Sequence, residues 1–148
     1  MKIERSALVP YSAKQMFELV NAVEEYSRFL PWCQKSKIVQ QGPLMVIAAM
    51  NIVWAGIHKT IVTRNNLHQY DRIDIELVEG PLKHLEGHWR FTQLSETTCK
   101  VNLVLEFEFT KSLVDRIFQP IFNHIANSLV DAFCKRAVEV YGQPQGFH

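Results

Sequence analysis

The chain has 148 residues, of which 47% are hydrophobic, so it is near the size of one ordinary domain and can bury one core. We therefore expect residues 1–148 to form a single domain. The 16 Lys and Arg residues and the 15 Asp and Glu residues leave a formal net charge of +1, so no global field draws the chain to DNA or to an anionic membrane.

The N-terminal part of the chain predicts one strand followed by two short helices. Residues 2–10 alternate loosely between apolar and polar and end at a proline, which suits a strand. Ser12 and Gln15 form the pattern of a capping box, so a helix is expected to begin there. Apolar residues at helical spacing over 23–30 predict a second short helix, which Pro31 ends.

Residues 34–110 change to a period of two, which predicts about six strands joined by turns. The clearest strand is 101–109, where five apolar residues alternate with polar ones. One face of the sheet is therefore dry and the other wet, as in an antiparallel meander. The expected turns lie at 42–43, 55–56, 65–66, 80–81 and 95–96.

Residues from about 112 to 141 return to helical spacing and predict a long helix with a broad apolar stripe. Pro120 cannot donate a backbone hydrogen bond, so a kink or a short break is expected near 118–120. The whole pattern is an α+β fold, in which a curved antiparallel sheet of about seven strands wraps around this helix. In such a helix-grip, either a cavity or bulky side chains must fill the space between sheet and helix.

Seven segments, in order along the chain, carry a further signal: 7–13, 17–20, 26–31, 80–83, 89–91, 107–109 and 137–141. Together they resemble the RatA/coenzyme-Q-binding family. The similarity runs from about residue 3 to 142 and implies a START-like helix-grip fold with an internal apolar cavity. For mitochondrial members it implies binding of ubiquinone or a similar polyprenyl lipid in support of respiration. For the bacterial ribosome association toxins it implies binding to the large ribosomal subunit, which blocks subunit association and inhibits translation.

The leading candidate site is the space between the dry sheet face and the long helix. A hydrophobic ligand there would gain about 25 cal/mol for each Å² of apolar surface removed from water. The alternative is that the same side chains fill the core themselves. No metal and no resident cofactor is expected besides a bound ubiquinone or other polyprenyl lipid. The expected cavity residues are Met50, Trp89, Phe91, Leu103, Leu105, Phe107, Phe118, Phe122, Ile125 and Leu129.

The loop over 78–85 is a second candidate, because loops held by a rigid sheet often carry function. It could form the entrance of the cavity, or it could be a plain connecting turn. Two cationic side chains are candidate polar handles for a ligand head group, although a lysine more often snorkels to water. The entrance candidates are Pro31, Trp32, Pro81 and Leu82, and the handle candidates are Lys59 and Arg5.

Cationic side chains could form a ribosome-facing patch, and only the resemblance favours this interpretation. Contact with RNA phosphates would make binding weaken as salt rises. Acidic residues are interspersed among the cations, which favours a solvated surface of mixed charge as the alternative. The candidates are Lys35, Lys37, Lys83 and Lys111, with His84, Arg116, Lys135 and Arg136 as further members.

Catalytic signatures are missing from the sequence. There is no glycine-rich phosphate loop, no nucleophile elbow and no obvious Ser-His-Asp or Cys-His set. His84 and His88 alternate along a strand without a third metal ligand. We therefore expect a non-enzymatic binding protein. The alternative is a polyketide cyclase or aromatase-like enzyme that acts on a hydrophobic substrate in the same cavity, by analogy with the fold class.

The chain is expected in the bacterial cytoplasm. Its three cysteines are far apart in sequence and suit free thiols in a reducing compartment. Charged residues at positions 2, 4 and 5 are unlike a signal peptide. The longest apolar stretch, 44–57, is shorter than the roughly 20 residues of a membrane-spanning helix. Apolar residues on both strand faces within this stretch leave a peripheral membrane contact open.

Overall fold

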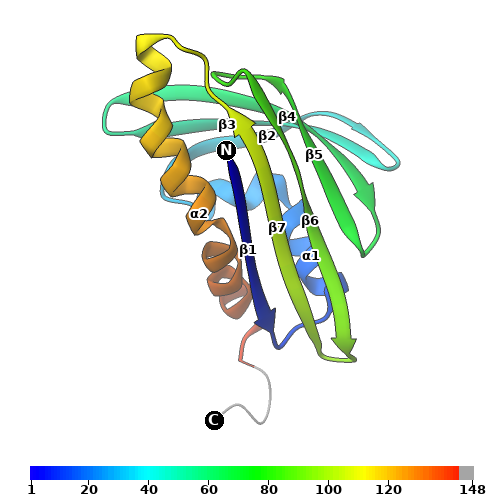
Figure 1. Cartoon of the computed structure of the whole chain (residues 1–148). Coiled ribbons are helices and arrows are strands. Elements are labelled where there is room, and N and C mark those ends of the chain that lie inside the picture. Colours follow the sequence, from blue (N-terminus) through cyan, green and yellow to red (C-terminus); the bar gives the residue numbers. More distant parts are fainter. Residues whose placement is uncertain (144–148) are drawn as a thin grey trace.

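The computed structural model describes residues 1–143, apart from the side chains of residues 114 and 115. Seven strands form one antiparallel sheet, and a long helix lies along it (Figure 1). The elements are β1 (Lys2–Val9), α1 (Ala13–Asn21), the 3-10 helix η1 (Val23–Arg28), β2 (Cys33–Gly42), β3 (Met45–Trp54), β4 (Ile57–His68), β5 (Arg72–Glu79), β6 (His84–Ser95), β7 (Thr98–Glu108) and α2 (Leu113–Tyr141).

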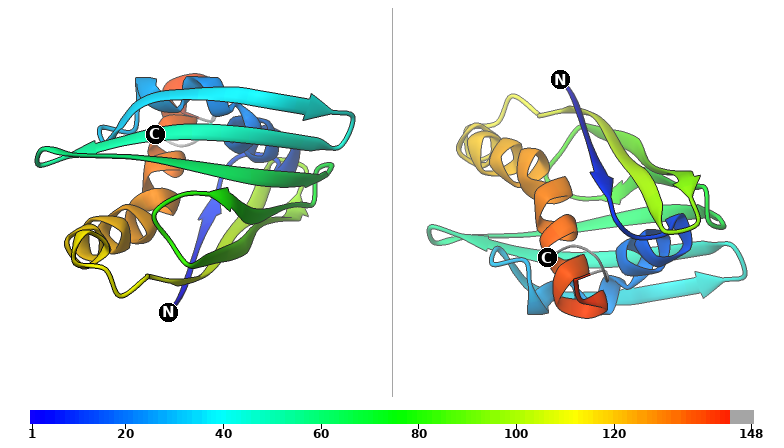
Figure 2. Two further views of the ribbon diagram at one scale, coloured as in Figure 1. Left: turned by 90° about the horizontal axis from the view of Figure 1, so that it is seen from above. Right: turned by 90° about the horizontal axis from the view of Figure 1, so that it is seen from below.

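The strand order in the sheet is β1-β7-β6-β5-β4-β3-β2, so consecutive strands from β2 to β7 are neighbours and β1 closes the sheet beside β7. Figure 2 shows the sheet curving around α2. The predicted α+β helix-grip is therefore confirmed, including the two short helices after the first strand.

The first helix begins where the sequence predicts. The backbone N–H of Gln15 donates a 3.1 Å hydrogen bond to Ser12 Oγ, and the Ser12 N–H donates a 2.9 Å bond to Gln15 Oε1. In this capping box, two backbone N–H groups at the start of the helix each donate to a side-chain oxygen. The apolar residues that follow, Met16, Phe17 and Val20, are buried and hold α1 against the sheet.

The turn predicted at Asn65 and Asn66 is wrong, because β4 runs on to His68 and the chain turns at 69–71 instead. Both asparagines are paired in register with β3 on one side and β5 on the other. Hydrogen bonds to two neighbouring strands outweigh the local turn propensity of an Asn-Asn pair. The other four predicted turns coincide with strand ends.

The long helix runs unbroken through Pro120, so of the kink or short break expected near 118–120 the structure excludes the break. Figure 2 shows α2 as one bent helix. A proline inside a helix leaves the carbonyl four residues earlier without its usual partner. Here that carbonyl belongs to Arg116, and both Arg116 and Pro120 are exposed, so water can satisfy it.

The core lies between the concave face of the sheet and the inner side of α2. Aromatic side chains connect the layers. The ring of Phe133 on α2 lies 5.2 Å from the ring of Trp89 on β6 and 5.3 Å from that of Tyr26 on η1. The ring of Phe122, nearer the start of α2, lies 4.9 Å from that of Phe107 on β7. These contacts hold α2 across the sheet at two levels.

Candidate functional site

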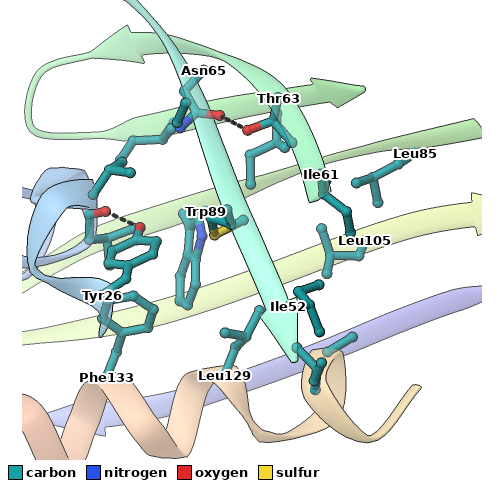
Figure 3. A pocket seen from close by; sticks show the side chains of 18 of the residues that line it. Tyr26, Ile52, Ile61, Thr63, Asn65, Leu85, Trp89, Leu105, Leu129 and Phe133 are labelled. Carbon is teal, nitrogen blue, oxygen red and sulfur yellow. Dashed lines mark hydrogen bonds between the residues drawn. The ribbon is translucent and has the colours of Figure 1, made fainter. Parts of the chain in front are cut away.

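A cavity of about 90 Å³ lies between the sheet and α2 (Figure 3). Its walls come from α1, η1, strands β3 to β7 and α2, with Trp32 between η1 and β2. Most lining side chains are buried, and four are half-buried: Met50, Asn65, Ile75 and Leu129. The cavity therefore approaches the surface beside these four.

The structure brings together six of the ten expected cavity residues on this wall: Met50, Trp89, Leu105, Phe122, Ile125 and Leu129. The other four, Phe91, Leu103, Phe107 and Phe118, are buried but do not line the cavity. Their side chains pack against other core groups, as the ring of Phe91 does at 5.8 Å from that of Phe17. For these four the alternative interpretation, that they fill the core, is the one that the structure shows.

The expected entrance is not assembled. Trp32 is buried and lines the cavity, but Pro31, Pro81 and Leu82 do not. Pro31 is exposed, and Leu82 is a buried core residue. The loop that carries Leu82 is tied to the end of β7, because the Lys83 N–H donates a 3.0 Å hydrogen bond to the Glu108 carbonyl. It is a connecting turn with Leu82 packed beneath it.

Neither expected polar handle reaches the cavity. Lys59 is half-buried on β4 and lies outside the lining. Arg5 is exposed on β1, where its guanidinium donates to the Asn127 Oδ1 on α2 and to the Glu4 carbonyl. Among the residues that the structure describes, no charged side chain lines the cavity.

The polar groups of the cavity are ones that the sequence analysis missed: Tyr26, Thr63 and Asn65, apart from the two indole N–H groups. The Tyr26 hydroxyl donates to the Val20 carbonyl, and burial raises the pKa of this tyrosine. The Thr63 hydroxyl donates a 3.0 Å hydrogen bond to Asn65 Oδ1 (Figure 3). The alternation that places Ile61 inward continues through Thr63 and Asn65 to Leu67. The sequence analysis predicted a turn at 65–66, so it did not place Asn65 on this strand face.

The candidate ribosome-facing cations do not gather in one patch. Lys35 and Lys37 lie on β2, whereas Lys83 and Lys111 lie beside the start of β6 and the end of β7, with β3, β4 and β5 between the two pairs. Lys135 and Arg116 are exposed on α2. Three side chains of this set lie against acidic residues: Lys83 against Glu108 at 3.8 Å, His84 against Glu86 at 3.5 Å and Arg136 against Glu139 at 3.0 Å.

Other chemistry-bearing groups are dispersed. Within the described part of the chain, no three His, Cys, Asp or Glu side chains are grouped to hold a metal ion. Cys33 and Cys99 are buried free thiols, and Cys134 is a half-buried one. Burial, with a smaller contribution from Cys134, raises the pKa of Cys99 to about 11. In residues 1–143 no helix is both long enough and apolar enough to cross a bilayer.

Comparison with known proteins agrees with this geometry. The family described as polyketide cyclase/dehydrase and lipid transport matches residues 9–134. The chain is 46% identical over 140 residues to the ribosome association toxin RatA of Escherichia coli (strain K12), covering 95% of this chain and 89% of that protein. It is 26% identical over 149 residues to the mitochondrial coenzyme Q-binding protein COQ10 homolog B of Xenopus laevis, covering 98% of this chain and 61% of that protein.

Among solved structures, the Zhui aromatase/cyclase of Streptomyces sp. R1128 superposes with a TM-score of 0.84 at 18% identity and covers 99% of this chain and 98% of its own. At that identity the likeness concerns the fold alone.

Proposed function

The chain belongs to the polyketide cyclase/dehydrase and lipid transport family, in the group of RatA and the coenzyme-Q-binding proteins, and from this premise we propose that it binds an uncharged lipid of the ubiquinone type in its cavity. The observation that carries the proposal is an apolar cavity with three polar side chains and no charged one among the described residues. A role in support of respiration, in the bacterial cytoplasm, is part of the proposal.

The wall chemistry favours a neutral head group. Burying a carboxylate or phosphate without a cationic partner costs far more than apolar contacts return. A quinone ring is uncharged, and its carbonyl oxygens need only hydrogen-bond donors. An apolar tail adds favourable burial along residues such as Ile52, Ile61 and Leu105, which lie on the wall.

The size of the cavity requires side chains to move on binding. A cavity of about 150 Å³ accommodates a benzene ring, and this one measures about 90 Å³. Met50 and Leu129 are half-buried lining residues on β3 and α2. The methionine side chain is unbranched and adapts readily, so outward rotation of these two side chains would make room for a ring.

Binding without catalysis is the simpler role for this site. General acid-base catalysis needs a group that titrates near the working pH. Tyr26 is the only lining side chain that titrates, among those described, and its hydroxyl is already bonded to Val20 while burial raises its pKa further. Among the described lining residues, the wall therefore supplies no side chain suited to general acid-base catalysis by a cyclase.

Two measurements test the proposal. Mass spectrometry of an organic extract of the purified protein should detect a prenylated quinone. Decylubiquinone should quench the fluorescence of Trp32 and Trp89, which both line the cavity, with saturation in the low micromolar range, whereas decanoate should not. Absence of saturable quenching by decylubiquinone would overturn the proposal.

Ribosome association is a second candidate function, and it is supported by the 46% identity to a protein named for that activity. It would use the outer surface, so it does not compete with a ligand in the cavity. The protein should then co-sediment with purified large ribosomal subunits at low salt and be released at high salt, and it should inhibit translation. Migration free of the subunits at low salt would exclude this candidate.

A further inference from the structure

We propose that Thr63 and Asn65 form a hydrogen-bonding subsite that holds a carbonyl oxygen of the ligand. The inference rests on the proposed binding of an uncharged lipid in this cavity. It adds which residues recognise the polar end of that lipid, and therefore how the lipid is oriented in the cavity.

The subsite is built by one strand. Thr63 and Asn65 are two residues apart on β4, so both side chains point to the same face of the sheet, and both line the cavity. Thr63 is only 5% exposed. Its hydroxyl donates a 3.0 Å hydrogen bond to Asn65 Oδ1 (Figure 3). This bond fixes the side-chain amide of Asn65, with its oxygen towards Thr63.

The Asn65 amide then has donors to spare. A primary amide carries two N–H groups, and Asn65 Nδ2 has no hydrogen-bond partner among the described residues. Besides Thr63 and the two indole N–H groups, the wall carries the polar side chain of Tyr26, whose hydroxyl donates to the Val20 carbonyl. Asn65 is therefore the side-chain amide on this wall whose N–H groups are free for a ligand.

Asparagine is an unfavourable residue at position 65 of β4. Asn is disfavoured in strands, and Asn65 lies opposite Val46 on β3 and Ile75 on β5. The unused N–H donors of this half-buried amide can be satisfied either by water or by an acceptor on a ligand. An acceptor without charge suits the site, because no cationic side chain is on the described wall to neutralise an anion. A quinone or ketone carbonyl meets both conditions.

The test compares two probes on three variants. The probes are decylubiquinone and decylbenzene, which share the decyl tail, but only decylubiquinone carries carbonyl and methoxy oxygens on its ring. The variants are Asn65→Leu, which removes the amide at similar size, Thr63→Val, which removes the hydroxyl that orients it, and Thr60→Val. Thr60 is a matched control, because its hydroxyl also donates a 3.0 Å bond to an asparagine, Asn51, but on the exposed face.

We expect Asn65→Leu to weaken decylubiquinone about tenfold, the usual worth of one or two hydrogen bonds. Thr63→Val should weaken it by a smaller factor, and Thr60→Val should leave it unchanged. Decylbenzene should bind Asn65→Leu at least as well as it binds the unmodified protein.

Three outcomes would overturn the subsite. If Asn65→Leu bound decylubiquinone as tightly as the unmodified protein, the subsite would be refuted, whereas the proposed function would stand. Equal weakening of both probes would mean a general disturbance of the cavity and not a lost hydrogen bond. Failure of decylubiquinone to bind the unmodified protein would overturn the proposed function and the subsite together. Thermal unfolding of each variant checks that it is folded.

Discussion

The hydroxyl of Tyr141, in the last turn of α2, donates a 2.7 Å hydrogen bond to the backbone carbonyl of Gln15 in the first turn of α1. Its ring centroid lies 5.7 Å from that of Tyr11, whose hydroxyl donates a 2.7 Å bond to the Gly142 carbonyl. The C-terminal end of α2 is thereby fastened to α1 and to the segment after β1. This anchor sets the position from which α2 extends over the cavity.

Replacement of Tyr141 with phenylalanine keeps the ring and removes the hydrogen bond to Gln15. We expect Tyr141→Phe to lower the free energy of unfolding by about 1 kcal/mol, measured by urea denaturation. Tyr70→Phe is the control, because Tyr70 is exposed and no hydrogen bond of its hydroxyl occurs among the described residues. Equal stability of the two variants would show that the anchor contributes nothing.

The close approach of β7 to β6 requires a glycine at position 87. A Cβ atom at Gly87 would lie 2.1 Å from the Val104 carbonyl oxygen and 2.9 Å from a Leu105 side-chain atom on β7. A backbone atom cannot give way cheaply, so Gly87→Ala should destabilise the protein by roughly 2 to 4 kcal/mol. At Gly42 the nearest atoms would be 4.0 Å away, so Gly42→Ala should change stability by less than about 0.5 kcal/mol. Similar urea midpoints for the two variants would contradict the argument.

The order and type of the elements could be predicted because alternation and helical spacing are local signals. Ser12 and Gln15 fixed the start of α1, since a capping box needs only residues three apart. The end of β4 could not be predicted in this way. Asn65 and Asn66 remain in the strand because of pairing with β3 and β5, which local sequence does not encode.

The cavity wall could be predicted only in part. Alternation shows which face of a strand is buried, but not how far along the strand the core is filled. Leu103, Leu105 and Phe107 therefore look equivalent in sequence, although Leu105 alone of the three lines the cavity. The polar members Thr63 and Asn65 were missed for a related reason, since a search for apolar side chains does not select polar residues on a dry face.

The thiol of Cys99 should make stability depend on alkaline pH. Burial raises its pKa from 9.0 to about 11 in the folded protein. The unfolded chain therefore releases this proton first, so the stabilising contribution is complete below about pH 9 and is lost as pH rises from about 9 to about 11. Urea unfolding at pH 8, 9 and 10 should show a smaller decline for Cys99→Ala than for the unmodified protein. Parallel declines would contradict the assignment.

A larger side chain at Ala126 should close the cavity without loss of the fold. Ala126 lies on α2, is 1% exposed and lines the cavity, so the added isopropyl group of Ala126→Leu would occupy space that a ligand ring needs. Because it fills a void, the change should leave the free energy of unfolding unchanged or raise it. Decylubiquinone should bind at least about tenfold more weakly, judged by tryptophan quenching.

Ala132→Leu is the matched control for Ala126→Leu. Ala132 lies on the same helix and packs against the core, but it is not part of the cavity wall. Its replacement should leave quinone affinity unchanged. If Ala126→Leu bound decylubiquinone as tightly as the unmodified protein while remaining folded, the ligand would have to sit outside the cavity, because the two could not share the same space. Weaker binding in both variants would instead indicate that any enlargement on α2 disturbs binding. That result would contradict the placement of the ligand beside Ala126.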